Sequence, residues 1–461
     1  MDGPVSSLPA PAMPMRIGQV VRSAIDLGHL PFAVVLYLMA VVLPMGFNLG
    51  PINLNGVRLL LLILILPMSF KLLAGGYGRL LLTDVCFFLH ALWFTLALAV
   101  NNPSQVVANA GSTGIEIIGG YVLGRAMIRT RADFIALIRT LSTICLCLFP
   151  FVLYETATGK AVILRALDAL PGLSSLKDIE IGKRLGVFRA QTVFSHPIHS
   201  GLFFIMTFSL CFIGLKGVYS EARRWLIGFV CATSCFLALS SGALLALVLQ
   251  LGLIIWALIF RKVKARWWLL LALFAVAYVV IDLLSNRTPM MVFLSYATFS
   301  AHTAYWRTLI FQYGMDNILA NPLFGIGLND WVRPSWMRSG SVDNFWLLTA
   351  MRYGIPGFLF LAVGYAWALI KIGRRNFEAD RALWTLRRAW MFSFMGLTFT
   401  LTTVHIWHAI FSFVFFMFGA GMWMQTAQPE TGETRKAPSA AEDRRAGPRY
   451  TRFTEKRMRR G

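Results

Sequence analysis

Residues 269–281 read LLLALFAVAYVVI and residues 59–66 read LLLLILIL, and neither run contains a charged side chain. A helix at the surface of a soluble protein needs only an apolar stripe, so runs that are apolar on every side indicate helices surrounded by lipid. The bias extends to the whole chain, because 57% of its 461 residues are hydrophobic and only 14% are charged. Soluble domains have about 45–50% hydrophobic residues and about 25% charged residues. The sequence therefore excludes a soluble enzyme with a single core and predicts an all-α polytopic membrane protein.

Windows of about 20 apolar residues predict about twelve transmembrane helices. Their approximate positions are 30–48, 57–74, 81–100, 106–124, 133–154, 198–216, 225–241, 242–260, 267–285, 345–371, 388–405 and 406–424. These spans form a transmembrane domain over residues 29–424. An N-terminal tail over 1–28 precedes it, and a basic tail over 425–461, predicted to be disordered, follows it.

The charge distribution predicts how the chain lies in the membrane. Lys and Arg number 43 against 21 Asp and Glu, which gives a net charge of +22. In a soluble protein this excess would indicate nucleic acid, but membrane proteins collect Lys and Arg in cytoplasmic loops. With the N-terminus in the cytoplasm, the predicted cytoplasmic loops carry the basic clusters at 125–131, 216–224, 261–266 and 374–388. Both termini are then expected in the cytoplasm, and the basic tail is expected to contact anionic membrane lipid rather than nucleic acid.

Two long connections fall on the opposite, periplasmic side, at about 155–197 and 286–344. Each is far longer than the usual connection of about 4–6 residues, and long ordered loops tend to be functional. We therefore expect the chemistry of this protein on its periplasmic face.

The first of these connections ends in a pair of arginines, Arg184 and Arg189, next to a predicted span. Arginine on the periplasmic side breaks the usual charge bias. A guanidinium group is always charged and binds phosphate oxygens in bidentate fashion, so the pair is suited to a diphosphate. The alternatives are contact with lipid headgroups and a structural ion pair with Asp178 or Glu180.

The second connection ends in Ser341-Val342-Asp343-Asn344, directly before a span. A carboxylate at this boundary can accept a proton from a sugar hydroxyl. The alternative is an N-cap, because Asp and Asn bind the free N–H groups at the start of a helix. The upstream Gly325-Ile326-Gly327 lacks the remaining features of a phosphate loop and is interpreted as turn residues.

The cysteines and acidic residues indicate no metal site. All six cysteines, at positions 86, 145, 147, 211, 231 and 235, fall inside apolar spans, where they act as small core residues. Asp178 and Glu180 form the only close acidic pair on the predicted outer side, and two carboxylates make a weak ligand set. The sequence therefore implies no metal and no cofactor.

The spacing around Asp343 and Asn344 resembles a motif of bacterial O-antigen ligases. Nine residues separate Asn344 from Gly354, and two residues separate Gly354 from Gly357. In that family, His is followed by Asn, Ser or Gln, nine residues, Gly, two residues, and a small residue or Tyr. Two further segments resemble the family: Arg184-Leu185-Gly186-Val187-Phe188 with His196-Pro197, and Trp306 with Pro322-Leu323-Phe324-Gly325-Ile326-Gly327. The resemblance covers roughly residues 180–420 and is to the O-antigen ligase and polymerase superfamily, which includes exopolysaccharide polymerases.

The chain departs from this family at two places. Asp343 stands where the ligases have His, and Ser240-Ser241-Gly242 stands where the family often has Ser-Arg after the seventh span. The missing His argues against a strict lipid A core ligase and favours a polymerase of the exopolysaccharide kind. The chemistry itself is retained, because Asp also serves as a base.

The resemblance implies a GT-C-like architecture and a metal-independent, inverting glycosyl transfer from an undecaprenyl-diphosphate-linked glycan to a sugar hydroxyl. Asp343 would deprotonate that hydroxyl. Arg184, Arg189 and Arg307 would hold the diphosphate and stabilise its growing charge.

Two more residues are candidate substrate contacts by the same resemblance. Asn344 would cap the helix or bind the acceptor sugar. His302 would bind substrate or only pack beside Trp306. Chain-length regulators and export proteins are candidate partners that the sequence does not identify.

Two other functions stay open at this point. The first is an O-antigen ligase that transfers the finished glycan to lipid A core or another acceptor. The second is a transporter or lipid flippase, because twelve spans are common among transporters. Transporters usually contain internal repeats, however, and the two halves of this chain show none.

Overall fold

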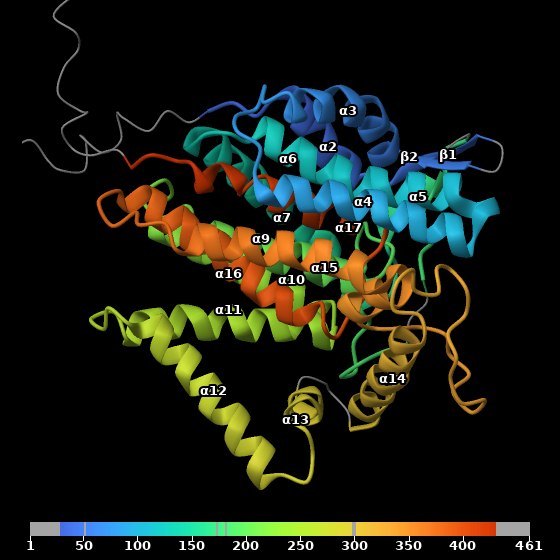
Figure 1. Cartoon of the computed structure of the whole chain (residues 1–461). Helices are drawn as coiled ribbons and strands as arrows, with labels where there is room; N and C mark the ends of the chain where they lie inside the picture. The colour runs from blue at the N-terminus through green and yellow to red at the C-terminus, as the bar shows by residue number, and fades with distance from the viewer. Residues whose placement is uncertain (1–27, 50–51, 172–173, 180–181, 297–300, 430–461) are drawn as a thin grey trace, which may run out of the picture.

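The computed structural model describes residues 28–49, 52–171, 174–179, 182–296 and 301–429 (Figure 1). Nearly all of both predicted tails lies outside the described residues. The longer helices are α2 (Phe32–Val42), α3 (Gly56–Leu73), α4 (Leu82–Asn101), α5 (Val106–Gly114), α6 (Gly120–Met127), α7 (Arg131–Thr158), α8 (Val162–Asp168), α9 (Pro197–Phe212), α10 (Glu221–Leu237), α11 (Ser241–Ile259), α12 (Arg266–Leu284), α13 (Pro289–Tyr296), α14 (Ala301–Ala320), α15 (Phe345–Gly373), α16 (Arg381–Thr400) and α17 (His408–Gly419). Two 3-10 turns, η1 (Pro103–Gln105) and η3 (Met422–Gln425), and one π-helical turn, η2 (Ile115–Gly119), complete the helical structure.

Within the described residues, eight helical segments are long and apolar enough to cross a membrane. They are Gly56–Leu73, Leu82–Asn101, Pro103–Met127, Arg131–Thr158, Ser241–Ile259, Arg266–Leu284, Phe345–Gly373 and His408–Gln425. Helices α2 and α9 are apolar but shorter, and α10 and α16 both pack against α9. The chain is therefore a helical membrane protein, while the predicted count of about twelve spans is not confirmed.

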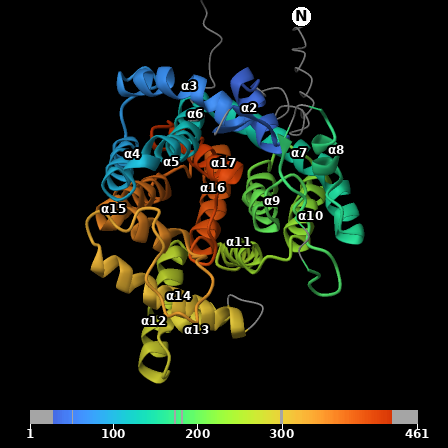
Figure 2. The same ribbon diagram turned by 90° about the vertical axis from the view of Figure 1, so that its right-hand side faces the viewer.

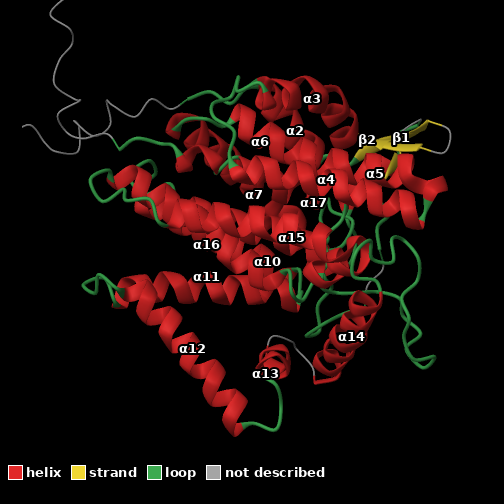
Figure 3. Cartoon of the chain, in the orientation of Figure 1, coloured by secondary structure: helices red, strands yellow, loops and turns green. Residues whose placement is uncertain are grey.

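The structure adds local detail to the predicted outer connections. Strands β1 (Met45–Leu49), β2 (Ile52–Asn55) and β3 (Ser174–Ser175) form a small antiparallel sheet in the order β2-β1-β3, shown beside α5 in Figure 3. The predicted connection 286–344 is not a plain loop, because it contains α13 and α14. The segment over 155–197 includes the end of α7 and the short helix α8.

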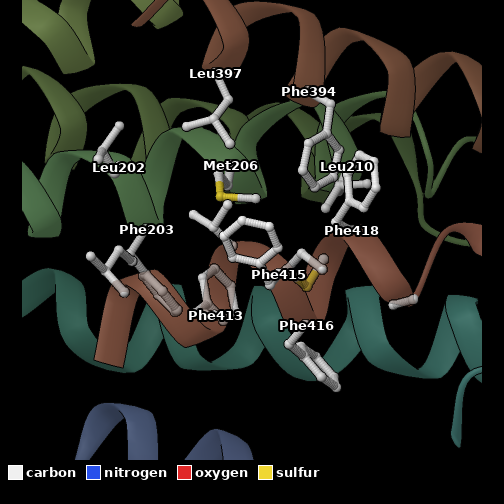
Figure 4. Packing of buried hydrophobic residues seen from close by; sticks show 14 of the residues in the cluster. Leu202, Phe203, Met206, Leu210, Phe394, Leu397, Phe413, Phe415, Phe416 and Phe418 are labelled. Atoms are coloured by element: carbon white, nitrogen blue, oxygen red, sulfur yellow. The ribbon is translucent and has the colours of Figure 1, made fainter. Parts of the chain in front are cut away.

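Helix α17 lies near the middle of the bundle, as Figure 2 shows, and most of its residues are buried. Large aromatic and aliphatic side chains of three helices meet here (Figure 4): Leu202, Phe203, Met206 and Leu210 of α9; Phe394 and Leu397 of α16; and Phe413, Phe415, Phe416 and Phe418 of α17. The buried indole of Trp390 donates a hydrogen bond to the Met417 carbonyl at 3.1 Å. This aromatic core fixes α9, α16 and α17 relative to one another. The starts of α9, α15 and α17 lie close together, because the His196 ring is 6.0 Å from that of Trp407 and the Phe345 ring is 6.3 Å from that of His405.

Helix α15 is broken at Gly354, whose φ of 70° and ψ of 177° lie in a region that essentially only glycine populates. The break releases the carbonyls of the preceding turn from their helical partners. The Met351 carbonyl instead accepts a hydrogen bond from the N–H of Ile326 at 2.8 Å, and the Arg352 carbonyl accepts one from Gly327 at 3.0 Å. Pro356, which has no N–H, leaves the Arg352 carbonyl without its usual helical donor.

The turn at 322–327 covers the same break from its other side. The N–H of Ile355 donates to the Pro322 carbonyl at 2.8 Å. A Cβ atom on Gly354 would lie 2.2 Å from the Leu323 carbonyl oxygen, so the turn also needs a glycine there. Two motifs that are far apart in the sequence thus form one hydrogen-bonded unit. The predicted role of the Gly-Ile-Gly segment as turn residues agrees with this geometry.

Replacing Gly354 with Ala is expected to destabilise the protein severely. The new Cβ would clash with the Leu323 carbonyl and force alanine into a backbone region costing about 1–3 kcal/mol before the clash is counted. Unfolding midpoints of the detergent-solubilised protein would measure this. Gly252→Ala is the control, because open space surrounds this α11 glycine and alanine favours helix there. Equal midpoints for the two variants would contradict the proposed fit of the turn against the break.

Candidate active site

Arg184 lies at one end of a tight two-residue turn. The N–H and C=O groups of Arg184 and Val187 bond to each other at 3.0 and 3.1 Å. Leu185 and Gly186 have φ values of 53° and 83°, which is the backbone of a type I′ turn. A Cβ on Gly186 would meet no atom within 4 Å, so the turn needs glycine for its conformation rather than for space.

The segment that follows is tied to the end of α7. The N–H of Phe188 donates to the Thr156 carbonyl at 3.2 Å. The buried carboxylate of Glu155 accepts hydrogen bonds from the N–H groups of Gln191 and Thr192, each at 2.8 Å. These contacts hold the backbone on both sides of Arg189, so α7 sets the position of that arginine.

The three predicted arginines converge on residues 238–241, which are the connection between α10 and α11 and the first residue of α11. The hydrogen bonds run from Arg184 Nη1 to the Leu239 carbonyl (2.9 Å), from Arg189 Nε to the Ala238 carbonyl (3.4 Å) and from Arg307 Nη2 to Ser241 Oγ (3.5 Å). Arg307 comes from α14, far along the chain from the other two. The structure thus brings together residues that the sequence placed in two separate loops.

This cluster concentrates positive charge in a partly dry place. Burial, together with the charge of Arg184, lowers the pKa of Arg189 to about 10. Burial also lowers the pKa of Arg307, where Asp343 opposes the shift and Arg184 adds to it. The Nε and Nη1 atoms of Arg307 are buried and have no hydrogen-bond partner among the described residues. Buried donors of this kind are costly unless an acceptor meets them, so the site is suited to an anion.

Asp343 and Arg307 line the same small pocket, together with Asn344, Leu347 and Thr402. Asn344 Oδ1 accepts a hydrogen bond from the Leu347 N–H at 3.0 Å and so provides the N-cap of α15. The carboxylate of Asp343 is exposed and accepts a hydrogen bond from Ser341 Oγ at 2.9 Å. Helix capping therefore falls to Asn344, and the Asp343 carboxylate faces the arginine site.

The described residues do not show the ion pair that was the alternative role of Arg184 and Arg189. Asp178 pairs with Arg165, at 2.5 Å between carboxylate and guanidinium, and not with Arg184 or Arg189. Glu180 lies outside the described residues. Within the described part of the chain, the hydrogen bonds of Arg184 and Arg189 go to backbone carbonyls instead.

Two histidines differ from what the sequence indicated. His302 is exposed, accepts a hydrogen bond from the Trp306 indole at 2.9 Å and does not line the pocket. His196 was not a candidate, yet burial and the charges of Arg189 and Arg184 lower its pKa to about 4, while Asp343 opposes the shift. The His196 ring caps α9 by accepting the Ile198 N–H at 3.1 Å. The sequence signal for this helix start was the proline that follows His196, because proline is common at the first position of a helix.

Among the described residues, no group of three or more His, Cys, Asp or Glu side chains is arranged to hold a metal ion. All six cysteines are free. The polar groups that the structure places at this site are guanidinium groups, a carboxylate and an imidazole.

The fold is that of a helical membrane protein, and its candidate site combines three arginines with one carboxylate. Residues 226–362 match the model of the O-antigen ligase family. The match confirms the predicted resemblance to the O-antigen ligase and polymerase superfamily. It includes Arg307, Asp343 and both halves of the hydrogen-bonded unit at Gly354, while Arg184 and Arg189 lie outside it. No curated protein matches the chain.

Replacing Glu155 with Ala should destabilise the protein and loosen the segment that carries Arg189. The change leaves the N–H groups of Gln191 and Thr192 buried without an acceptor, at a cost of about 1–3 kcal/mol. Thermal unfolding of the purified protein measures the loss. Glu378→Ala, at an exposed loop position, is the matched control and should leave the midpoint unchanged. An unchanged midpoint for Glu155→Ala would show that these hydrogen bonds contribute little.

The stability of the protein should fall in acid partly through His196. Its pKa is about 4 in the folded protein against 6.5 when unperturbed, so the unfolded state binds more protons between these values. The contribution of His196 is thus complete above pH 6.5 and decreases as the pH falls toward 4. Unfolding midpoints across this range should decline less steeply for His196→Gln than for the wild type. Parallel curves would place the pH dependence on other groups.

Proposed function

We propose that this protein is a polysaccharide polymerase that joins undecaprenyl-diphosphate-linked glycan repeat units. The observation that carries the proposal is the convergence of Arg184, Arg189 and Arg307 on residues 238–241, beside the carboxylate of Asp343. A diphosphate leaving group needs several cationic donors in a poorly hydrated place, and a sugar hydroxyl needs a base close by. The match to the O-antigen ligase family supports a glycosyl transfer over the transporter alternative.

The proposed reaction uses each group once. The acceptor hydroxyl oxygen forms a bond to the anomeric carbon of the donor glycan, while the bond from that carbon to the diphosphate oxygen breaks. Attack from the opposite face inverts the anomeric centre. Asp343 takes the hydroxyl proton, and the buried N–H groups of Arg307, with Arg184 and Arg189, stabilise the negative charge on the departing diphosphate. No metal or cofactor takes part in this scheme.

The same chemistry supports a second candidate, because the matching family is described as O-antigen ligase. A ligase would use Asp343 on a hydroxyl of lipid A core or another acceptor instead of a second glycan repeat. Asp in place of the ligases' His favours the polymerase. In either case we propose that both termini are cytoplasmic and that the site faces the periplasm of a bacterial inner membrane. Chain-length regulators and export proteins are proposed as further partners.

A complementation experiment tests the proposal. A deletion strain would receive wild type, Asp343→Asn, Arg189→Ala or Asp316→Asn at matched expression, and the glycans and lipid-linked precursors would be sized. Asp343→Asn and Arg189→Ala should lower long-chain glycan about 100-fold or more, which is the range for losing a general base or charge stabilisation. Asp316→Asn is the control, because its exposed α14 carboxylate lies outside the pocket.

The precursors separate the candidate functions. Single repeat units that accumulate on the lipid identify a polymerase, whereas long chains stranded on the lipid identify a ligase. Wild-type behaviour of Asp343→Asn would reject Asp343 as the base. A deletion that changes neither glycan nor precursors would reject glycosyl transfer and return transport as the leading function.

A further inference from the structure

A second cavity, of about 110 Å³, lies against the first half of α15 and is separate from the Asp343 pocket. Its lining mixes aromatic rings with a few polar groups, as ligand sites generally do. The residues on which the argument rests are Phe345, Thr349, Arg352, His405, Trp407 and Glu116. None of them was a candidate substrate contact from the sequence.

The two cavities are neighbours along one helix. Asn344 lines the first cavity and Phe345 lines the second, so they open on different sides of the start of α15. The N–H of Phe345 donates to the carbonyls of Leu401 and Val404, at 2.9 and 3.1 Å, which fixes this wall between them. Arg352 lies seven residues after Phe345, or about 10 Å along the axis of α15. The two cavities therefore lie at different heights along the first turns of this helix.

Arg352 brings an uncompensated charge into this cavity. Glu116, the carboxylate that lines it, is already bonded to Arg58, with its Oε1 at 2.8 Å from both Nε and Nη2 of that arginine. In the described part of the chain, Arg352 forms no ion pair. An arginine within a membrane-spanning segment is costly and points to a functional role by default.

Three further features indicate an occupant. The Nδ1 atom of His405 is buried without a hydrogen-bond partner in the described residues. Glu116 belongs to the π-helical turn η2, a local irregularity that is frequent at functional sites. Rings of Phe345 and Trp407 flank His405, at centroid distances of 6.3 and 5.9 Å. Flat apolar faces beside separate polar donors match the shape and polarity of a sugar ring.

We propose that this cavity binds a carboxylate-bearing sugar of the acceptor glycan, with Arg352 paired to the carboxylate. The inference rests on the proposed function, because it takes the acceptor hydroxyl to lie at Asp343. A single arginine near the Glu116 carboxylate matches one negative charge better than the two of a phosphate monoester. A neutral sugar would leave Arg352 without an anion, and a site built for a charged partner discriminates strongly against the analogue that lacks it.

Titration calorimetry of the full-length protein tests this with three matched sugars: glucuronic acid, glucose and glucose 6-phosphate. The wild type should bind glucuronic acid about tenfold or more tightly than glucose, the range for one charge-assisted hydrogen bond. Arg352→Gln should abolish this preference, whereas Arg352→Lys should keep part of it. Arg338→Gln, at an exposed position of the predicted connection 286–344, is the control and should retain the preference in full.

Inorganic pyrophosphate separates this inference from the proposed function. Arg307→Gln should weaken pyrophosphate binding and leave the preference for glucuronic acid intact, and Arg352→Gln should do the reverse. If Arg307→Gln does not change pyrophosphate binding, the proposed diphosphate site at the arginine cluster is wrong. The proposed carboxylate site at Arg352 is then judged by the glucuronic acid preference alone.

Three results would overturn the inference. The first is equal affinity of the wild type for glucuronic acid and glucose. The second is an unchanged preference in Arg352→Gln. The third is an Arg352-dependent preference for glucose 6-phosphate over glucuronic acid, which would identify a phosphate site, such as one for a lipid headgroup, instead.

Discussion

The need to satisfy every backbone hydrogen bond within a membrane governs the architecture around the site. A break in a spanning helix frees carbonyl groups that lipid cannot bond, so irregular backbone persists only where other parts of the protein supply partners. At Gly354 the turn at 322–327 supplies the donors, and Pro322 accepts in return. That turn follows the end of α14, which carries Arg307, and precedes the segment that ends in Asp343. The same hydrogen bonds that permit the break therefore also position the connection from α14 to Asp343.

The arginine cluster is assembled on a different principle. Its members come from an exposed turn, from a segment tied to α7 and from α14, and all three contact residues 238–241, through two backbone carbonyls and the Ser241 hydroxyl. Carbonyls and a hydroxyl hold the guanidinium groups without neutralising them. A carboxylate in the same position would have fixed the arginines equally well but would have cancelled the charge. The geometry therefore combines rigidity with retained positive charge, the combination that electrostatic stabilisation of a leaving group requires.

The apolar runs were sufficient to predict a helical membrane protein, and motif spacing was sufficient to predict Asp343 and the arginines as site candidates. The sequence did not show which of Asp343 and Asn344 caps the helix, because either residue type can do so. Only the hydrogen bond from the Leu347 N–H to Asn344 Oδ1 identifies Asn344 as the cap. Arg352 was missed because it lies inside an apolar window. Its significance depends on Glu116 being bonded to Arg58, a long-range contact that no local pattern records.

Helix α12 differs from the rest of the bundle, because none of its residues is buried and Figure 1 shows it leaving the bundle beside α11. Its apolar surface is left to the membrane rather than to other helices. Exchanging one large apolar side chain of this helix for another therefore changes its contact with lipid and leaves the packed core of the bundle as it is.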